Sequence, residues 1–260
     1  MDLETAQRLS QLTSEFYASV NLSFSQTRQA PWSGWERVTE LSGLRELRSP
    51  RVLDLACGNL RFEHFLEQVL DATEPQFFAF DSCDELVGET PLVCKSHYLH
   101  IDIAEALFAG DDLAATLGVL DCDLSVCFGF MHHLALPQHR ADVLDALVSC
   151  TAPGGTVAVS FWQLSHSEKL LAKAQRTTRD RAPELGLSGL GEGDYLLGWQ
   201  GSTDVLRYCH DFSEAEIDDL VRSVGSRASE IARFSSDGAS GDLNRYLVLR
   251  VEPAGFPRLT

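Results

Sequence analysis

Five short apolar segments, each followed by a turn and a helix-like stretch, dominate the first 162 residues of this chain. They lie at 51–56, 76–81, 97–103, 121–128 and 155–162. Strands that are apolar on both sides are usually buried on both sides, as in a parallel sheet covered by helices. The alternation of strands and helices therefore predicts an α/β fold with helices on both faces of the sheet.

The C-terminal part predicts a different kind of strand pairing. The runs 227–234 and 243–251 are joined by the turn-rich segment 235–242, which is typical of an antiparallel hairpin at a sheet edge. Together the segments predict a doubly wound, mostly parallel seven-stranded sheet with an antiparallel C-terminal hairpin and extra N-terminal helices.

Helices are predicted between and before these strands. Leu9, Leu12, Phe16 and Val20 have helical spacing, and Ser213 with Glu216 forms a capping-box pattern at the start of a late helix. Further helices are expected at 34–48, 60–70, 138–150 and 166–180, and the glycine-rich stretch 183–206 is expected to be irregular.

Composition narrows the classes of partner. The chain has 260 residues and a net charge of −17, so its overall field repels phosphate and disfavours nucleic acid. If the protein acts on RNA, a local arginine cluster or a partner must supply the attraction. No apolar stretch approaches a membrane span, and the polar N-terminus lacks a secretory pattern, so we expect a cytoplasmic protein without a membrane partner.

The seven cysteines are scattered and never spaced as Cys-x-x-Cys, and most lie in apolar runs. We therefore expect buried free thiols and no metal site.

The turn after the first strand has the placement of a ligand-binding loop. It contains Gly58, whereas Ala56 and Leu60 stand where a phosphate-binding turn has two more glycines. A pyrophosphate needs close backbone approach at several points, so this turn suits a cofactor without phosphate. Asp54, just before the turn, is placed to accept a hydrogen bond from a ligand ammonium group.

Three further residues lie at the ends of the next strands. Asp81 follows Gly58 by 23 residues, the usual position of an acid that binds ribose hydroxyls. Asp102 ends the third strand within reach of an adenine amino group, and Phe128 ends the fourth. Either aspartate could instead cap a helix.

This set of motifs, from Asp54 to the Pro153-Gly154-Gly155 turn, resembles the seven-stranded, Rossmann-like methyltransferases that use S-adenosylmethionine. The resemblance implies S-adenosyl-L-methionine as cofactor. It places Asp54, Ala56 and Gly58 beside the methionine part, Asp81 at the ribose and Asp102 at the adenine, with Phe128 at the same edge.

The flanking segments resemble a narrower family, the tRNA methyltransferases that esterify 5-carboxymethyluridine at the wobble position. The similar segments are Phe24-Ser-x-Thr-Arg-x-x-Pro-Trp32, the double histidine after Met131, Gly193–Trp199 and Arg207-Tyr-x-His210. Gly198 and Cys209 stand where that family has a proline and a second tyrosine.

A carboxylate acceptor fits the residues available. Such a group is ionised at neutral pH and needs positioning rather than a general base. Arg28 and Arg207 are candidates to hold it through bidentate hydrogen bonds, although either could instead form a surface ion pair. His132 could line the acceptor pocket or pack in the core, and Trp32 and Trp199 could stack on a base or pack in the core.

We therefore expect a single methyltransferase domain over 1–260: an N-terminal helical cap at 1–48, a cofactor-binding core at 49–162, and an acceptor-side insertion with the closing hairpin at 163–260. The expected function is methyl transfer to a carboxylate, and the leading candidate for the acceptor is 5-carboxymethyluridine at the tRNA wobble position. A small-molecule carboxylate, favoured by the charge of −17, and an inactive binding subunit, favoured by Leu60, are the alternatives. The sequence leaves open whether an activating protein subunit takes part.

Overall fold

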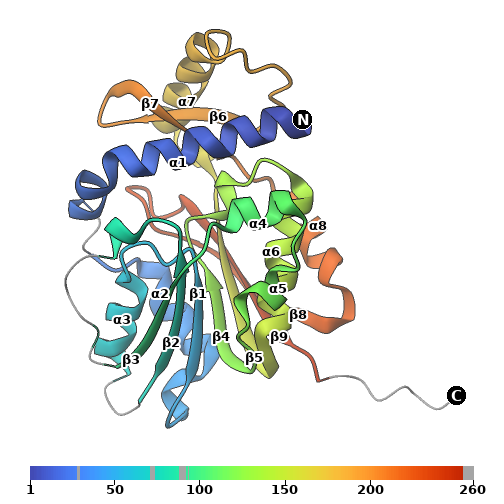
Figure 1. Cartoon of the computed structure of the whole chain (residues 1–260). Coiled ribbons are helices and arrows are strands. Elements are labelled where there is room, and N and C mark those ends of the chain that lie inside the picture. The colour runs from blue at the N-terminus through green and yellow to red at the C-terminus, as the bar shows by residue number, and fades with distance from the viewer. Residues whose placement is uncertain (28–29, 71–73, 88–91, 93, 254–260) are drawn as a thin grey trace, which may run out of the picture.

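The computed structural model describes residues 1–27, 30–70, 74–87, 92 and 94–253. In this part of the chain a seven-stranded sheet has the order β3-β2-β1-β4-β5-β9-β8 (Figure 1). Strands β1 to β5 are parallel, and β9 pairs antiparallel with both β5 and β8. The predicted fold class is confirmed. The strands are β1 Arg51–Leu55, β2 Gln76–Asp81, β3 Lys95–His100, β4 Cys122–Cys127, β5 Thr151–Trp162, β8 Ala228–Ser236 and β9 Asn244–Val251.

Helices cover both faces of this sheet because its strands are apolar on both sides. On β1, Val52 packs with Trp35 and Phe62 on one face, whereas Leu53 and Leu55 pack into the core on the other. The first face is covered by α2 (Ser33–Ser42) and α3 (Arg61–Val69). The second is covered by α4 (Ile103–Ala109), α5 (Leu113–Leu117), α6 (Pro137–Cys150) and α8 (Glu214–Val224) (Figure 1).

Several predicted boundaries were wrong. The helix expected at 34–48 ends at Ser42, because Gly43 adopts a left-handed conformation with φ 72° and a short 3₁₀ turn follows at Leu44–Glu46. The third strand ends at His100 rather than at 103, and α4 begins directly after Asp102. Helices α4 and α5 were not predicted.

The stretch 183–206 is not irregular throughout, as the sequence had suggested. Residues Asp194–Trp199 (β6) and Ser202–His210 (β7) form a separate two-stranded antiparallel sheet. Gly198 allows this tight hairpin, because a Cβ there would lie 2.0 Å from the backbone oxygen of Ser202. A glycine that suggests a loop is therefore what permits the strand pairing.

This second sheet lies between two helices above the carboxyl ends of the main strands (Figure 1). Leu196, Leu206 and Tyr208 pack against Leu9 and Leu12 of α1 (Leu3–Gln26). Helix α7 (Glu168–Arg181) packs against β6 through Ala174 and Leu197. We call α1, β6, β7 and α7 the cover.

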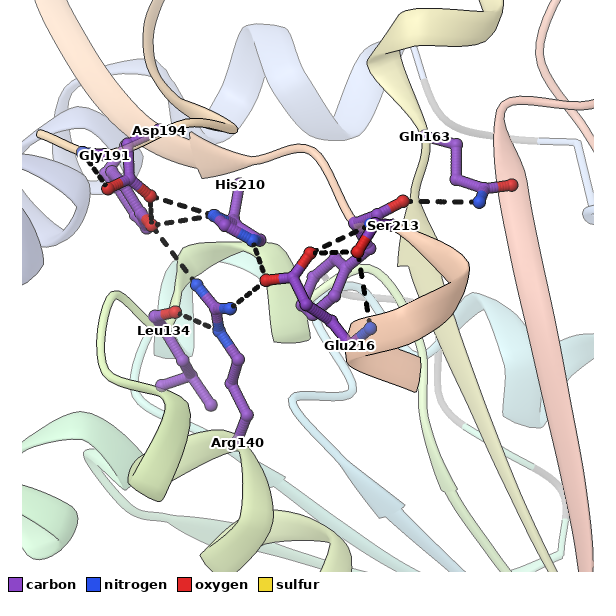
Figure 2. Close-up of polar contacts among 10 residues, drawn as sticks. Leu134, Arg140, Gln163, Gly191, Asp194, His210, Ser213 and Glu216 are labelled. Atoms are coloured by element: carbon purple, nitrogen blue, oxygen red, sulfur yellow. Dashed lines mark hydrogen bonds and ion pairs between the residues drawn. The ribbon is translucent and has the colours of Figure 1, made fainter. Parts of the chain in front are cut away.

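A buried ionic network joins the cover to the main sheet domain (Figure 2). His210 of β7 contacts Asp194 of β6 through Nδ1 (2.9 Å) and Glu216 of α8 through Nε2 (2.7 Å). Arg140 of α6 donates to Glu216 at 3.3 Å and to the carbonyl of Leu134 at 2.8 Å. Glu216 also closes the capping box with Ser213, as predicted from the sequence.

Six of the seven cysteines are buried, in line with the sequence, and all seven are free thiols. In the described part of the chain, every helix is either too short or too polar to cross a bilayer.

Candidate active site

A cavity of about 550 Å³ lies between the carboxyl ends of the main strands and α1. Its lower wall comes from the segments after β1, β2 and β4, which a parallel sheet brings to one edge. Its wall includes all six residues predicted to bind the cofactor, namely Asp54, Ala56, Gly58, Asp81, Asp102 and Phe128, and also His132.

The turn after β1 has three residues in a backbone conformation that favours glycine, although only one of them is a glycine. Ala56, Gly58 and Leu60 have φ values of 65°, 56° and 55°, all in the left-handed region. Only glycine adopts this region at no steric cost, so Ala56 and Leu60 are held there by their surroundings. A Cβ on Gly58 would meet no atom within 4 Å, so the backbone at this point is open. Leu60 therefore adopts the left-handed conformation that a glycine at this position would adopt freely.

Asp81 ties this turn to the next one. Its carboxylate accepts the N–H of Gly58 at 2.9 Å and the N–H of Cys83 at 2.9 Å. Burial raises the pKa of Asp81 above its ordinary value, and these two N–H groups oppose that change.

Asp54 has an acidic neighbour that the sequence analysis missed. The side chain of Glu63, in the first turn of α3, is completely buried beside Asp54, which is 3% exposed. Burial, together with the mutual repulsion of the two groups, raises the pKa of Asp54 well above its usual range, and burial raises that of Glu63 to about 7. One signal was available in the sequence: Glu63 lies between Phe62 and Leu66 on the apolar face of an amphipathic helix.

Asp102 and Phe128 line the cavity but also have structural partners. The Asp102 carboxylate accepts the N–H of Glu105 and caps α4, so the capping alternative applies to it. Phe128 is buried against Trp35, Phe62 and Tyr246.

The opposite part of the cavity is built from the double histidine and α1. The His132 ring is stacked on Trp162, with centroids 3.9 Å apart and planes at 9°. His133 contacts the carbonyl of Tyr208 through Nδ1 (2.7 Å) and the hydroxyl of Tyr17 through Nε2 (2.9 Å). Sequence reasoning treated α1 only as an amphipathic helix and missed its role in the wall, to which it contributes Ser10, Thr13, Ser14, Tyr17 and Ala18.

Arg207 lies behind this wall rather than in it. The side chain is buried, and its guanidinium carbon lies over Phe16 at 4.5 Å, Trp162 at 5.6 Å and Trp199 at 5.9 Å. Within the described residues its Nε and Nη1 have no hydrogen-bond acceptor and no carboxylate pairs with it. Trp32 lines the cavity, whereas Trp199 packs edge-on against Phe16. Arg28 lies outside the described residues.

Donor atoms of His132, His133 and Cys209 lie within 4.8 Å of one another. Both ring nitrogens of His133 are already engaged in hydrogen bonds, and the Arg207 guanidinium lies beside the Cys209 thiol. A cation would have to displace these hydrogen bonds and accept a positive neighbour, so this donor set suits a metal poorly.

The fold is that of the Rossmann-like, S-adenosylmethionine-dependent methyltransferases. A methyltransferase structure of this class from Methanosarcina mazei aligns with a TM-score of 0.59 at 14% identity, covering 82% of this chain and 98% of that one. The 1,6-didemethyltoxoflavin-N1-methyltransferase of Burkholderia thailandensis, solved with bound S-adenosylhomocysteine, aligns with a TM-score of 0.57 at 15% identity, covering 96% and 90%.

Two curated proteins are similar in sequence. A putative methyltransferase of Encephalitozoon cuniculi is 26% identical over 212 residues, which are 81% of this chain and 84% of that protein. The tRNA (carboxymethyluridine(34)-5-O)-methyltransferase ALKBH8 of Macaca fascicularis is 24% identical over 163 residues, which are 62% of this chain. The chain spans about a fifth of the length of that second relative, 21%. No known protein-family profile matches the chain.

Proposed function

We propose that this protein is an S-adenosylmethionine-dependent methyltransferase that esterifies a carboxylate, with 5-carboxymethyluridine at the tRNA wobble position as the acceptor. The observation that carries the proposal is the distribution of uncompensated buried charge. Carboxyl groups without a cation lie at the sheet edge, and a guanidinium without a carboxylate lies on the acceptor side. These charges are complementary to a cationic methyl donor and an anionic acceptor.

The residues at the sheet edge fit the cofactor. Asp54 Oδ1 is buried without a hydrogen-bond donor among the described residues, and Asp54 lines the cavity, so it can accept a bond from the ammonium of the methionine part. In this proposal Asp81, which lines the cavity, binds the ribose, and the open backbone at Gly58 leaves room for the cofactor to approach closely. When bound, S-adenosylmethionine supplies a methyl group on a sulfonium, and its transfer to a carboxylate oxygen leaves a methyl ester and a neutral thioether.

The acceptor side suits a group that needs no deprotonation. An ionised carboxylate is already nucleophilic, so the protein has only to orient it and exclude water. The Arg207 guanidinium is a buried cation with no carboxylate partner among the described residues, and it lies against Trp162, which lines the cavity. In this proposal the Trp162 ring turns aside so that Arg207 holds the acceptor, Arg28 remains the second candidate, and His132 lines the cavity beside the acceptor. The thiols offer no alternative nucleophile, because burial raises the pKa of Cys57 and of Cys127 well above the usual range.

A basic stripe on the cover supports an RNA acceptor in spite of the net negative charge. Lys169, Lys173 and Arg176 recur on α7 at spacings of four and three, which places them on one side of the helix. They include two of the three lysines in the chain, and none of them takes part in an ion pair among the described residues. Helix α7, which carries this stripe, belongs to the cover above the carboxyl ends of the strands (Figure 1). A local attraction of this kind is what phosphate binding needs.

The test is the chemistry of the product. The protein is incubated with methyl-labelled S-adenosylmethionine and bulk tRNA, and the labelled tRNA is treated with mild alkali. We expect the label to be released as volatile methanol, because hydroxide cleaves a methyl ester and leaves methyl groups on ring atoms or ribose oxygen in place. Label that survives alkali would contradict carboxylate methylation, and absence of labelling would contradict the activity.

The role of Arg207 is tested in the same assay. Arg207→Lys keeps the charge but loses the planar pair of donors, so we expect cofactor binding to persist while most of the turnover is lost. Arg45→Lys, at an exposed ion pair with Glu36, serves as the matched control and should leave turnover unchanged. If Arg207→Lys turns over at the wild-type rate, the proposal that Arg207 holds the acceptor is wrong.

A small-molecule carboxylate is the second candidate acceptor, favoured by the net charge of −17. The same alkali test on a metabolite extract separates the two. Alkali-labile label in the small-molecule fraction, with none in tRNA, would move the assignment to this second acceptor.

A further inference from the structure

We propose that Glu63 is a positioning residue of the cofactor site: it shares a proton with Asp54 in the free protein, and a proton is released when the cationic cofactor binds. This inference rests on the proposed function, because it takes S-adenosylmethionine as the cofactor.

The geometry is a pair of buried carboxyl groups without a counterion. Glu63 is completely buried and does not line the cavity, whereas Asp54 is 3% exposed and does. Among the described residues neither oxygen of Glu63, nor Oδ1 of Asp54, receives a hydrogen bond from an N–H or O–H group. Each of the two groups alters the pKa of the other, and a hydrogen bond between two carboxyl groups requires one of them to carry a proton, because two carboxylates have no donor.

The surroundings do not neutralise the pair. Acidic Asp81 of β2 and Glu67 of α3 face it, together with the thiols of Cys57 in the turn and Cys127 of β4. Glu67 is itself engaged with the N–H of Cys94 and with His64. No Lys or Arg of the described chain forms an ion pair with Asp54 or Glu63. Two like charges in a dry site cannot both ionise, so the pair keeps a proton near neutral pH.

The cofactor changes this balance. An ammonium group beside Asp54 supplies the missing positive charge and favours the ionised pair. The proton that leaves goes to the solvent buffer. Binding and proton release are therefore linked, and affinity rises with pH until the pair of the free protein is ionised. Glu63 does not touch the cofactor in this scheme; it acts through Asp54.

The experiment is calorimetric titration of wild-type protein with S-adenosylmethionine in two buffers of different ionisation enthalpy. The buffer dependence of the heat counts the protons released. We expect net release near pH 7, and a dissociation constant that rises by about tenfold for each pH unit below that range. Infrared difference spectra should show loss of a protonated-carboxyl band when the cofactor binds.

Glu63→Gln tests the residue itself. The amide keeps the size of the side chain and donates to Asp54, so the variant should bind with little proton release and a flatter pH profile. Glu40→Gln, an exposed residue of α2 away from the pair, is the matched control and should release protons like the wild type. A thermal melt establishes that each variant is folded.

The outcomes separate the two proposals. Wild-type protein that binds with no proton release and no change in the infrared band overturns the role of Glu63 while leaving the methyltransferase proposal in place, as does unchanged proton release in Glu63→Gln. Wild-type protein that binds neither S-adenosylmethionine nor its demethylated product overturns both.

Discussion

Two buried ionisable clusters in this protein have opposite electrostatic character. At the sheet edge the acidic side chains of Asp54, Glu63 and Asp81 lie together without a basic side chain paired to them among the described residues. Between the cover and the main sheet, Asp194 and Glu216 flank His210, and Arg140 joins them (Figure 2). The first cluster lines or adjoins the cavity, and the second connects four elements of the fold.

The pKa directions follow this difference. Burial works to raise the pKa of Glu216, but its hydrogen bonds with His210 and Ser213 lower it to about 2. Burial likewise acts on Glu63 and raises its pKa to about 7, because no cation opposes it. Burial alone therefore does not decide whether a carboxyl group is ionised. A compensated cluster stabilises the fold, and an uncompensated one leaves charge for a ligand to match.

Removing the centre of the compensated cluster should have the largest effect. His210→Ala leaves the buried Asp194 carboxylate with less positive charge and removes one partner of Glu216, whose side chain is 37% exposed. We expect the free energy of unfolding to fall by about 3 kcal/mol, mainly through Asp194. Urea denaturation measures this loss. His166→Ala, at an exposed contact with Asp242, is the control and should cost less than about 0.5 kcal/mol. Equal losses in the two variants would mean that the network contributes no special stability.

Asp81→Ala tests the uncompensated cluster by binding rather than by stability. The change leaves the N–H groups of Gly58 and Cys83 without their acceptor and, in the proposed function, does the same to the ribose hydroxyls of the cofactor. We expect cofactor affinity to fall by about 1–3 kcal/mol, measured by calorimetry. Asp84→Ala, three residues further on and paired with exposed His100, should bind like the wild type. Unchanged affinity in Asp81→Ala would count against the site.

The compensated cluster also predicts a pH window for stability. Although burial works to lower it, hydrogen bonds with Asp194 and Glu216 raise the pKa of His210, so its contribution is present below its ordinary pKa and is lost as pH rises through the folded value. Glu216 has a lowered pKa, so its contribution is present above its ordinary value of 4.5 and is lost as pH falls toward about 2. Stability from the network should therefore be greatest between about pH 4.5 and 6.5. Urea midpoints of wild type and His210→Ala across pH should differ most in that window; a constant difference would contradict the assignment.

The smallest expected effect concerns backbone strain beside the uncompensated cluster. Ala56 has φ 65°, and glycine relieves that strain, so Ala56→Gly should raise the free energy of unfolding by about 0.5 kcal/mol after the entropy cost of glycine. The same substitution in an exposed position of α5, Ala115→Gly, should lower it by about 0.5–1 kcal/mol. Denaturation curves of the two variants should therefore shift in opposite directions. A shift in the same direction would mean that the turn is not strained at Ala56.

Much of the fold was predictable because its signals are local. Buried strands such as Val52–Leu55 and the capping box of Ser213 and Glu216 depend on neighbouring residues, and both were predicted. The hairpin of β6 and β7 was not, because its glycines suggest turns until the contact between Gly198 and Ser202 is known. That contact depends on pairing across the hairpin, which no short pattern encodes.

The candidate site was predictable in part, for the residues that directly follow the parallel strands. The aspartates at the strand ends meet at one edge because parallel topology puts them there. Tyr17 and the aromatic residues around Arg207 were missed, because their contacts join segments far apart in sequence. Glu63 was missed although its place on the apolar face of α3 was a local signal. Tyr17, for example, meets His133 across 116 residues of chain.

Helix α1 has a consequence for how acceptor specificity can diverge. Its 24 residues extend about 36 Å, and it contacts Ser188 near its start, His133 in its middle and Asn59 near its end. Helix α1 thus contributes one continuous segment to the cavity wall beside the double histidine, while the aspartates of the wall follow the strands. Substitutions on one face of this single helix, in evolution or in a laboratory library, can therefore change the shape of the cavity without changing the main sheet.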